Sequence, residues 1–271
     1  MKRFVGRTVL VTGASTGIGE GVAVRFAREG AGVVVNYSRN AAEAEKTAIR
    51  VREAQAAAGA PEAKCVVIQA DVSDESQVEA MFERTLGELG RLDVLINNAG
   101  IQKPKSSHEM SAEDFDRILG VNLRGAWMCA RSAIRHFLSR PGGGVIVNNS
   151  SVHEIIPKPQ YVSYSISKGG MENLTKTLAL EYADRDIRVN AVGPGAIVTP
   201  INASWIDNPK ARAEVESHIP MGRSGTVEEM AGVFAFLASE EASYITGQTL
   251  FACGGLTLYP EYRGTWASGA E

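Results

Sequence analysis

The sequence predicts an α/β fold in which a seven-stranded parallel sheet is covered by helices on both faces. The first observation behind this prediction is that seven short apolar runs alternate with segments of helical spacing along the whole 271-residue chain. The second is that some runs, such as Val33-Val34-Val35, are continuously apolar, which is typical of strands buried on both faces of a parallel sheet. We therefore expect a doubly wound α/β sheet.

The first four strands and three helices fall within the first hundred residues. Residues 8–11 form a short apolar run, residues 18–28 have helical spacing, and residues 41–58 are rich in the helix formers Ala, Glu and Arg. In chain order we predict strand Thr8–Val11, helix Ile18–Arg28, strand Gly32–Tyr37, helix Ala41–Ala58, strand Lys64–Ala70, helix Glu75–Glu88 and strand Leu92–Asn97.

The remaining strands and helices continue the alternation. A long stretch of helical spacing covers residues 112–138 and another covers residues 161–182, and a strand-like run follows each of them. In chain order we predict helix Ala112–Leu138, strand Gly144–Ser150, helix Tyr161–Tyr182, strand Ile187–Val192, helices Pro209–Glu216 and Val227–Leu237, and strand Thr249–Ala252.

The pattern favours one domain over the whole of residues 1–271, because no internal repeat, low-complexity tract or linker interrupts it. Helix breakers gather in one segment after a late strand, at Pro200, Pro209, Pro220, Gly222 and Gly225. Ligands of open α/β sheets bind at the carboxyl ends of the strands. We therefore expect residues from about 198 to 225 to form a loop or lid over the substrate.

Composition and charge exclude several classes of protein. A formal charge of −3 argues against a nucleic-acid-binding surface. The longest apolar run, Met230–Ala238, is far shorter than the roughly 18–20 residues of a membrane span. Arg7, Thr8 and Thr12 interrupt the apolar region that a signal peptide would need, so we expect none. The three widely spaced cysteines fit a reducing compartment, and we therefore expect a cytoplasmic protein. The four histidines lack ligand spacing, and we expect no metal.

A glycine-rich turn follows the first predicted strand directly. Its spacing is G-x-x-x-G-x-G, and glycines of this kind let the backbone approach a pyrophosphate that lies at a helix N-terminus. An ordinary glycine turn is the alternative, but the position between the first strand and the first helix favours a dinucleotide site. The candidate residues are Gly13, Ser15, Thr16, Gly17, Ile18 and Gly19.

The end of the second predicted strand indicates which dinucleotide is used. A carboxylate at this place would bind the ribose 2′-hydroxyl of NAD. The chain instead has Asn36-Tyr37-Ser38-Arg39, with no carboxylate before Glu43. Arg39, beside Ser38, could bind the 2′-phosphate of NADP by charge-assisted hydrogen bonds; the alternative is a solvated loop arginine. We expect NADP to be accepted and NAD to be used as well, because nothing repels it.

A second group of residues has the spacing of a catalytic site. Tyr164 and Lys168 stand four residues apart and project from one helix face. Ser151 precedes Tyr164 by 13 residues, Asn97-Asn98-Ala99-Gly100 ends an earlier strand, and Asn122 lies in the following helical stretch. With the glycine turn, Asp71 and Pro194-Gly195, these motifs resemble the short-chain dehydrogenase/reductase family, in the same order and over about residues 7–255.

The resemblance implies a Rossmann-type fold with a seven-stranded sheet, a homotetramer, and a catalytic set of Asn122, Ser151, Tyr164 and Lys168. Tyr164 would be the general acid or base, and Ser151 would hold the substrate oxygen. The ammonium of Lys168 would lower the pKa of Tyr164 and also bind the nicotinamide ribose, and Asn122 would position a relay water. The family's cofactor contacts map onto Asp71, Val72, Asn98, Ala99, Gly100, Pro194, Gly195, Ile197 and Thr199, together with Tyr164 and Lys168.

Within this family the substrate half is similar to the bacterial glucose 1-dehydrogenases. Matching stretches include Ser150–Glu154, Thr199–Ala203 and Ile219–Gly222, whereas Lys158 and Cys253 depart from that pattern. The resemblance implies oxidation of β-D-glucose at C1 to the lactone. The candidate substrate residues are Gln102, Ser151, His153, Tyr164 and Asn202, with Glu154 nearby; Gln102 stands where those enzymes usually have Glu.

Three alternatives stay open at this point. The chain could be a 3-oxoacyl-carrier-protein reductase, for which Lys103, Lys105 and Lys158 hint at the required basic patch, or a polyol dehydrogenase. A non-catalytic dinucleotide sensor is disfavoured because it would not need the Tyr–Lys pair. For the homotetramer, the aromatic residues Tyr259, Tyr262 and Trp266 beyond the last strand suggest an interface.

Overall fold

The computed structural model describes residues 2–60 and 62–258. It contains a single sheet of seven parallel strands in the order β3-β2-β1-β4-β5-β6-β7. The predicted doubly wound, Rossmann-type sheet is therefore confirmed. The strands are β1 Thr8–Val11, β2 Gly32–Tyr37, β3 Cys65–Gln69, β4 Val94–Asn97, β5 Gly144–Asn149, β6 Ile187–Pro194 and β7 Thr249–Ala252.

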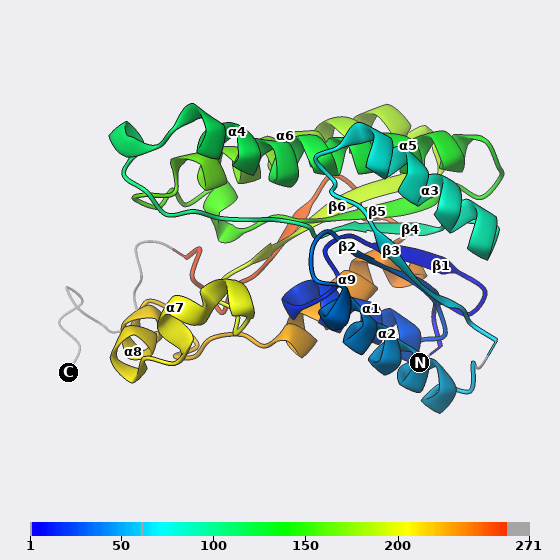
Figure 1. The fold of residues 1–271 in the computed structure, drawn as a ribbon, viewed down its shortest axis with the longest axis horizontal. Coiled ribbons are helices and arrows are strands. Elements are labelled where there is room, and N and C mark those ends of the chain that lie inside the picture. Colours follow the sequence, from blue (N-terminus) through cyan, green and yellow to red (C-terminus); the bar gives the residue numbers. More distant parts are fainter. Residues whose placement is uncertain (1, 61, 259–271) are drawn as a thin grey trace.

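Helices form a layer on each side of this sheet (Figure 1). α1, α2 and α9 cover one face, and α3, α4, α5 and α6 cover the other (Figure 1). α7 and α8 lie to one side of the sheet, within the segment that was expected to be a lid. The helices are α1 Gly17–Arg28, α2 Ala41–Ala57, α3 Glu75–Leu89, α4 Ala112–Leu119, α5 Ala126–Leu138, α6 Val162–Tyr182, α7 Ala203–Ile206, α8 Pro209–Ser217 and α9 Val227–Ala238.

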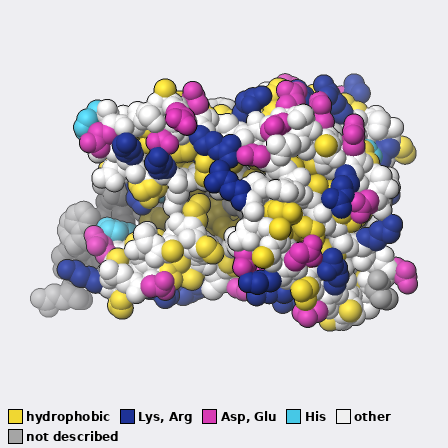
Figure 2. Space-filling model, viewed as in Figure 1, with side chains coloured by type: hydrophobic (Ala, Val, Ile, Leu, Met, Phe, Trp, Pro, Cys, Tyr) yellow, Lys and Arg dark blue, Asp and Glu magenta, His cyan; other side chains and the backbone are white. Residues whose placement is uncertain are grey.

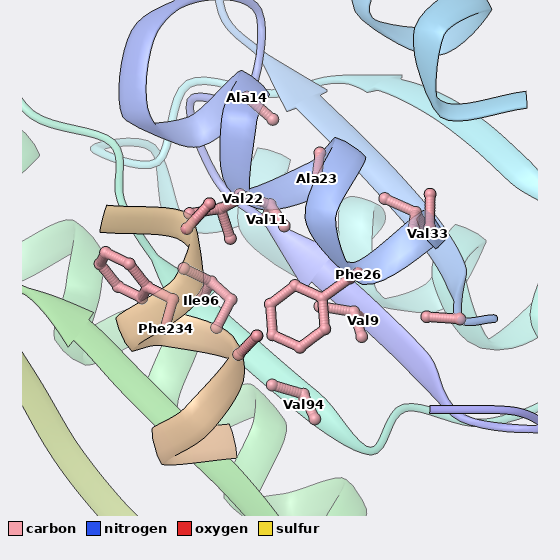
Figure 3. Close-up of a cluster of buried hydrophobic side chains, with 14 of the residues drawn as sticks. Val9, Val11, Ala14, Val22, Ala23, Phe26, Val33, Val94, Ile96 and Phe234 are labelled. Carbon is pink, nitrogen blue, oxygen red and sulfur yellow. The ribbon is translucent and has the colours of Figure 1, made fainter. Parts of the chain in front are cut away.

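The continuously apolar strands supply two cores at once. In β1, Val9 and Val11 point to the core beneath α1 and α9, whereas Leu10 points to the core on the other face. Figure 3 shows the first core, in which Phe26 of α1 and Phe234 of α9 pack over the valines of the central strands. All five side chains are fully buried. The sheet is thus held rigidly from both sides, which fixes the positions of the strand ends.

The predicted helix over residues 112–138 is interrupted. A π-helical turn, Gly120–Gly125, separates α4 from α5. The side chain of Asn122 ties this turn to the backbone of Ile101. Its Oδ1 accepts from the amide of Ile101 at 2.8 Å, and its Nδ2 donates to the carbonyl of Ile101 at 2.9 Å. Single π-turns inside helices are frequent at functional sites. Helical spacing alone could not reveal this break.

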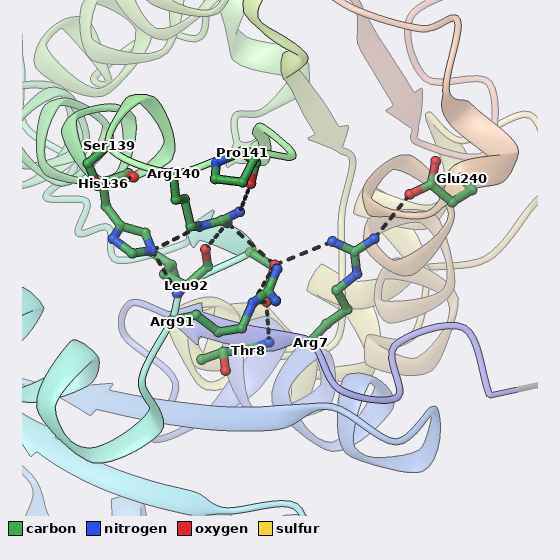
Figure 4. A network of polar contacts seen from close by, with 10 residues as sticks. Arg7, Thr8, Arg91, Leu92, His136, Ser139, Arg140, Pro141 and Glu240 are labelled. Atoms are coloured by element: carbon green, nitrogen blue, oxygen red, sulfur yellow. Dashed lines mark hydrogen bonds and ion pairs between the residues drawn. The ribbon is translucent and has the colours of Figure 1, made fainter.

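A buried carboxylate organises the amino ends of the central strands (Figure 4). Asp93, which is 3% exposed, accepts a hydrogen bond from the amide of Thr8 at 2.9 Å and ion-pairs with Arg7, Arg91 and Arg140. A buried charge needs such partners to offset its desolvation. This network lies at the opposite edge of the sheet from the carboxyl ends of the strands, so its part in the molecule is structural.

Candidate active site

A cleft of about 1520 Å³ opens at the carboxyl ends of the strands. Figure 2 shows this side of the molecule hollowed, with Lys and Arg side chains along one margin of the hollow. Every predicted cofactor and substrate residue lines the cleft, as do Ser151, Tyr164 and Lys168. Asn122 alone among the predicted site residues does not line it. The topology thus brings together residues that are as much as 189 positions apart, from Gly13 to Asn202.

The glycine turn leads from β1 into the open N-terminus of α1. Gly13 and Gly17 have φ angles of 60° and 61°, which favour glycine. The N-cap residue Thr16 makes no side-chain hydrogen bond to the helix, so the first-turn amides are free to bind an anion. Asn36 of β2 fixes the turn by accepting from the amide of Gly13 at 3.1 Å. These donors fit the pyrophosphate of a dinucleotide.

Sequence reasoning overlooked the part that Asn36 plays in this turn. It is 1% exposed, and its Nδ2 donates to the carbonyls of Ile68 and Ala70 at 3.3 and 3.1 Å. A buried amide must be hydrogen-bonded to be tolerated. The signal that could have revealed it is a polar residue directly after the three valines in the buried run of β2. Asn36 therefore joins β1, β2 and the end of β3 beneath the predicted pyrophosphate site.

The end of β2 carries no carboxylate toward the cleft. Ser38 and Arg39 both line the cleft and are exposed. The side chain of Arg39 makes no ion pair with any described residue. Its guanidinium is therefore available for an anionic ligand at this end of the cleft.

The opposite wall of the same end is formed by Asp71 and Val72 after β3. Burial alone would raise the pKa of Asp71, but hydrogen bonds from Ser73 and from Arg117 outweigh that effect and lower it. Arg117, on α4, ion-pairs with the carboxylate at 2.9 Å and itself lines the cleft. Sequence reasoning did not single out Arg117, since its partner is 46 residues away.

The turn after β4 closes the floor of the cleft. The side-chain amide of Asn98 donates to the carbonyls of Thr12 and Gly13, each at 2.9 Å, and its oxygen accepts from Asn149 of β5 at 2.9 Å. These bonds tie the turns after β1, β4 and β5 to one another. They hold Ala99 and Gly100 against the glycine turn, where the β-carbon of any residue replacing Gly13 would lie 2.8 Å from the α-carbon of Ala99.

Ser151, Tyr164 and Lys168 meet in the middle of the cleft. Tyr164 and Lys168 lie one turn apart on α6, with the Lys168 Nζ 5.5 Å from the centre of the Tyr164 ring. The hydroxyl of Ser151, just past β5, hydrogen-bonds with the Tyr164 phenol. The ammonium of Lys168 donates to the carbonyl of Asn149 at 2.6 Å. This arrangement places a hydroxyl, a phenol and an ammonium around one point of the cleft.

The pKa values of this group differ from the sequence-based expectation. Burial raises the pKa of Tyr164, and the hydrogen bond with Ser151 opposes that rise. Burial also lowers the pKa of Lys168 to about 8, against the opposing charge of Glu154. The Lys168 ammonium donates to a backbone carbonyl and makes no hydrogen bond with the phenol. Burial therefore remains the largest influence on the Tyr164 pKa.

Asn122 lies behind this centre rather than in the cleft. It is fully buried, and besides its two bonds with Ile101 its Nδ2 donates to the hydroxyl of Ser167 on α6 at 3.1 Å. Both of its amide hydrogens are thus used within the protein. In this structure the side chain of Asn122 holds the backbone after β4 against α6, and the expected bond to a relay water is not available from its amide hydrogens.

Three of the predicted substrate residues, Gln102, His153 and Asn202, share one feature. Each uses a side-chain donor on a backbone carbonyl of the protein: Gln102 on Ile201 at 3.1 Å, Asn202 on Ile197 at 2.8 Å, and His153 Nδ1 on Ile156 at 2.8 Å. Burial lowers the pKa of His153, so the ring is neutral and its Nε2 carries a lone pair. Each residue therefore keeps one acceptor atom for a ligand.

Glu154 and Tyr161 differ from expectation in opposite ways. Glu154 does not line the cleft; its carboxylate accepts from the Ser150 hydroxyl at 2.5 Å, and burial raises its pKa. Tyr161, which sequence reasoning passed over, does line the cleft, with its ring 6.2 Å from that of Tyr164 and 6.3 Å from that of His153. Its spacing of three residues before Tyr164 could have revealed it.

The described part of the chain, residues 2–60 and 62–258, offers neither a metal site nor a membrane-spanning helix. No group of three or more His, Cys, Asp or Glu side chains there could hold a metal ion. No helix in that part of the chain is long and apolar enough to cross a membrane.

Comparisons with known proteins agree with this geometry. A family model described as enoyl-(acyl carrier protein) reductase matches residues 13–257. A glucose 1-dehydrogenase of Gluconobacter oxydans is 49% identical over 266 residues, which cover 98% of this chain and 97% of that protein. The 3beta-hydroxysteroid dehydrogenase 1 of Eggerthella lenta is also 49% identical, over 258 residues that cover 95% of this chain and 96% of the relative.

Solved structures give the same result. The structure of a gluconate 5-dehydrogenase from Burkholderia cenocepacia, in complex with NADP and tartrate, aligns with a TM-score of 0.86 at 33% identity, covering 94% of this chain and 97% of that one. Fold and site together define an oxidoreductase that acts on alcohol groups with a nicotinamide dinucleotide. The chain belongs to the short-chain dehydrogenase/reductase family, which confirms the resemblance read from its motifs.

Proposed function

We propose that the protein is a glucose 1-dehydrogenase that oxidises β-D-glucose at C1 to the lactone. The observation that carries this proposal is the set of acceptor atoms left by Gln102, His153 and Asn202 in the cleft. A sugar presents several hydroxyl donors around its reacting carbon, and a site built to accept them discriminates strongly for such a substrate. The similarity to a glucose 1-dehydrogenase supports the same conclusion.

The catalytic roles follow from the side-chain chemistry. The bound dinucleotide supplies a hydride acceptor for oxidation or a hydride donor for reduction. Ser151 holds the substrate oxygen by hydrogen bond, and Tyr164 takes its proton in oxidation or returns it in reduction. Lys168 keeps a positive charge beside the phenol, and it would hold the ribose of a bound cofactor. Asn122 holds the turn after β4 in place against α6.

The experiment that tests the substrate is an activity assay over glucose, other aldoses, polyols, a 3-hydroxysteroid and an acyl ketone, with NADP and with NAD. We expect the highest kcat/KM with glucose. Oxidation of no aldose, together with turnover of the steroid or the acyl ketone, would overturn the glucose proposal and leave the dehydrogenase class intact.

One observation favours a second candidate, a hydroxysteroid substrate. Ile201, Trp205, Val215 and Leu258 give the outer part of the cleft an apolar lining, which suits a fused-ring alcohol. The equal similarity to a 3beta-hydroxysteroid dehydrogenase agrees with it. An acyl-carrier substrate has less support, because Asp114 ion-pairs with Lys103 at 2.7 Å and so neutralises part of the basic patch that an acidic carrier would need.

For the cofactor we propose use of both NADP and NAD. Arg39→Ala should weaken NADPH binding by about 1.5–3 kcal/mol, because a charge-assisted contact with the 2′-phosphate is lost, and should leave NADH binding nearly unchanged. Fluorescence titration of each reduced cofactor measures the two dissociation constants. Arg84→Ala, which removes a surface arginine of α3 outside the cleft, is the matched control. Equal losses for both cofactors in Arg39→Ala would contradict this role.

We also propose that the chain is one dinucleotide-binding domain in which residues from about 198 to 225 form the substrate lid. Gln102 would hold this segment through its bond to Ile201. Three of the other proposed cofactor contacts, Pro194, Gly195 and Ile197, directly precede the lid, and Thr199 lies at its start. Its opening would then admit the substrate and its closure exclude water.

For the assembly we propose a homotetramer. Large apolar side chains are exposed on several helices, including Trp127 on α5, Ile166 and Leu180 on α6, and Tyr244 after α9. Tyr259, Tyr262 and Trp266, which the sequence suggested for the interface, lie outside the described residues. Light scattering should give four times the mass of the chain; a monomer at assay concentration would contradict the proposal.

A further inference from the structure

The turn between β5 and α6 presents a lysine to the cleft on a constrained backbone. Lys158 stands between Pro157 and Pro159, and each proline fixes its own φ and restricts the residue before it. Gln160 follows with a φ of 69°, which is uncommon for a residue other than glycine. Its carbonyl accepts from the amide of Lys105 at 2.8 Å. The chain therefore holds the Lys158 backbone in one place at the cleft margin.

The side chain of Lys158 lies over an aromatic cluster that reaches the catalytic tyrosine. Its Nζ is 4.5 Å from the centre of the Tyr161 ring, within the range of a cation–π contact. The Tyr161 ring is stacked on His153 and stands edge-on to Tyr164. All four side chains line the cleft. The ammonium is thus one aromatic ring away from the phenol that handles the substrate proton.

The charge of Lys158 is not neutralised. The two carboxylates that line the cleft within the described residues, Asp71 and Asp114, are ion-paired with Arg117 and Lys103. Among those residues no carboxylate oxygen lies within 4.0 Å of the Lys158 ammonium, whereas Lys103 and Arg117, which also line the cleft, each have a carboxylate partner. The histidine in contact with the same tyrosine ring is neutral. The substrate half of the cleft therefore carries a net positive charge at its margin.

We infer that Lys158 binds an anionic group, a carboxylate or a phosphate, at the end of the substrate remote from the oxidised carbon. The inference rests on the proposed function, because a hexose oxidised at C1 carries its C6 substituent on the far side of the ring. An uncharged C6 hydroxymethyl group gains little from an ammonium already in water. A C6 carboxylate or phosphate forms charge-assisted hydrogen bonds with it. The site would therefore also take glucose derivatives that carry a carboxylate or a phosphate at C6.

Binding to the NADPH-loaded protein tests this inference without turnover. Glucose, glucuronate and glucose 6-phosphate differ only at C6, and titration calorimetry gives their dissociation constants. We expect one or both anionic sugars to bind about tenfold more tightly than glucose, with the preference weakening at high ionic strength. Lys158→Gln should remove the preference and Lys158→Glu should reverse it. The exposed side chain is not part of the core, so both variants should fold.

Lys103→Gln is the matched control, because it removes the same formal charge from the same margin while Lys103 already has Asp114 as its partner. The Lys103→Gln variant should keep the preference for anionic sugars over glucose within about twofold, because solvent and salt screen the effect of a charge that does not contact the ligand. A preference unchanged in Lys158→Gln, the same loss in both glutamine variants, or binding of none of the three sugars would overturn the inference.

The three sugars also separate the possible outcomes. Tight binding of glucuronate alone assigns a carboxylate, and tight binding of glucose 6-phosphate alone assigns a phosphate. If glucose is not oxidised but the preference and its loss in Lys158→Gln are found, the glucose proposal fails and the anion site stands. If glucose is oxidised without any such preference, the anion site fails and the glucose proposal stands.

Discussion

Replacing Tyr164 by Phe should lower the turnover number for alcohol oxidation by a factor of about 10³–10⁴, the upper part of the range for a general acid–base residue. The phenol is the group placed to exchange a proton with an oxygen that Ser151 holds. Phe keeps the ring and its contacts with His153 and Tyr161, so packing changes little. Stopped-flow or steady-state assays with either cofactor measure the decrease in the turnover number.

Two controls separate chemistry from structure in this experiment. Tyr182→Phe removes a phenol from the last turn of the same helix. The Tyr182 ring packs on the core between the sheet and α3, α5 and α6, away from the cleft, so this variant should keep turnover within a few-fold of the parent. The dissociation constant of NADPH should be unchanged in Tyr164→Phe, since the phenol is not needed for the pyrophosphate contacts. Turnover within tenfold of the parent would refute the catalytic role of Tyr164.

The Tyr164 pKa also bears on how the site works. Because burial raises it, the phenolate is scarce in the protein alone. Burial at the same time lowers the pKa of Lys168 to about 8, so the ammonium is still mostly protonated near pH 7 and loses its proton as the pH rises through 8. An oxidised nicotinamide bound in the cleft would add a positive charge, and a nearby positive charge favours the phenolate.

Much of the fold could be predicted because its strands are buried on both faces. Continuous runs such as Val33-Val34-Val35 leave no alternation to misread, and the helices between them must cover both sides. The π-turn at Gly120–Gly125 could not be predicted, since it depends on Asn122 reaching the backbone of Ile101, which is 21 residues away. Local periodicity carries no information about such a contact.

The catalytic group could be predicted because its spacing follows from one helix, with Tyr164 and Lys168 a turn apart. For Gln102 and Asn202, by contrast, the contacts depend on the tertiary structure and not on spacing along one helix. Gln102 donates to the carbonyl of Ile201 and Asn202 to that of Ile197, and only the folded backbone shows which side-chain atoms remain for a ligand. Motifs thus predicted residues that line the cleft, and the three-dimensional structure was needed to show the hydrogen bonds that Gln102 and Asn202 already make.

The glycine turn provides the second large expected effect. Gly13→Ala should lower the free energy of unfolding by about 2–5 kcal/mol and weaken NADPH binding by more than about tenfold. A left-handed conformation costs a residue with a side chain about 1–2 kcal/mol, and the φ of Gly13 is 60°. Overpacking adds about 1–3 kcal/mol, because the new β-carbon would lie 2.8 Å from the Ala99 α-carbon, a backbone atom that Asn98 and Asn149 hold in place.

Gly87→Ala is the matched control for that substitution. Gly87 lies within α3 outside the cleft, with no positive φ and no atom within 4 Å of the position a β-carbon would take. Alanine there should raise the free energy of unfolding by about 0.5–1 kcal/mol, because glycine is the poorer helix former, and should leave NADPH binding unchanged. Urea unfolding and cofactor titration measure both quantities. If Gly13→Ala kept parental stability and affinity, the close approach of the turns after β1 and β4 would not be what shapes the cofactor site.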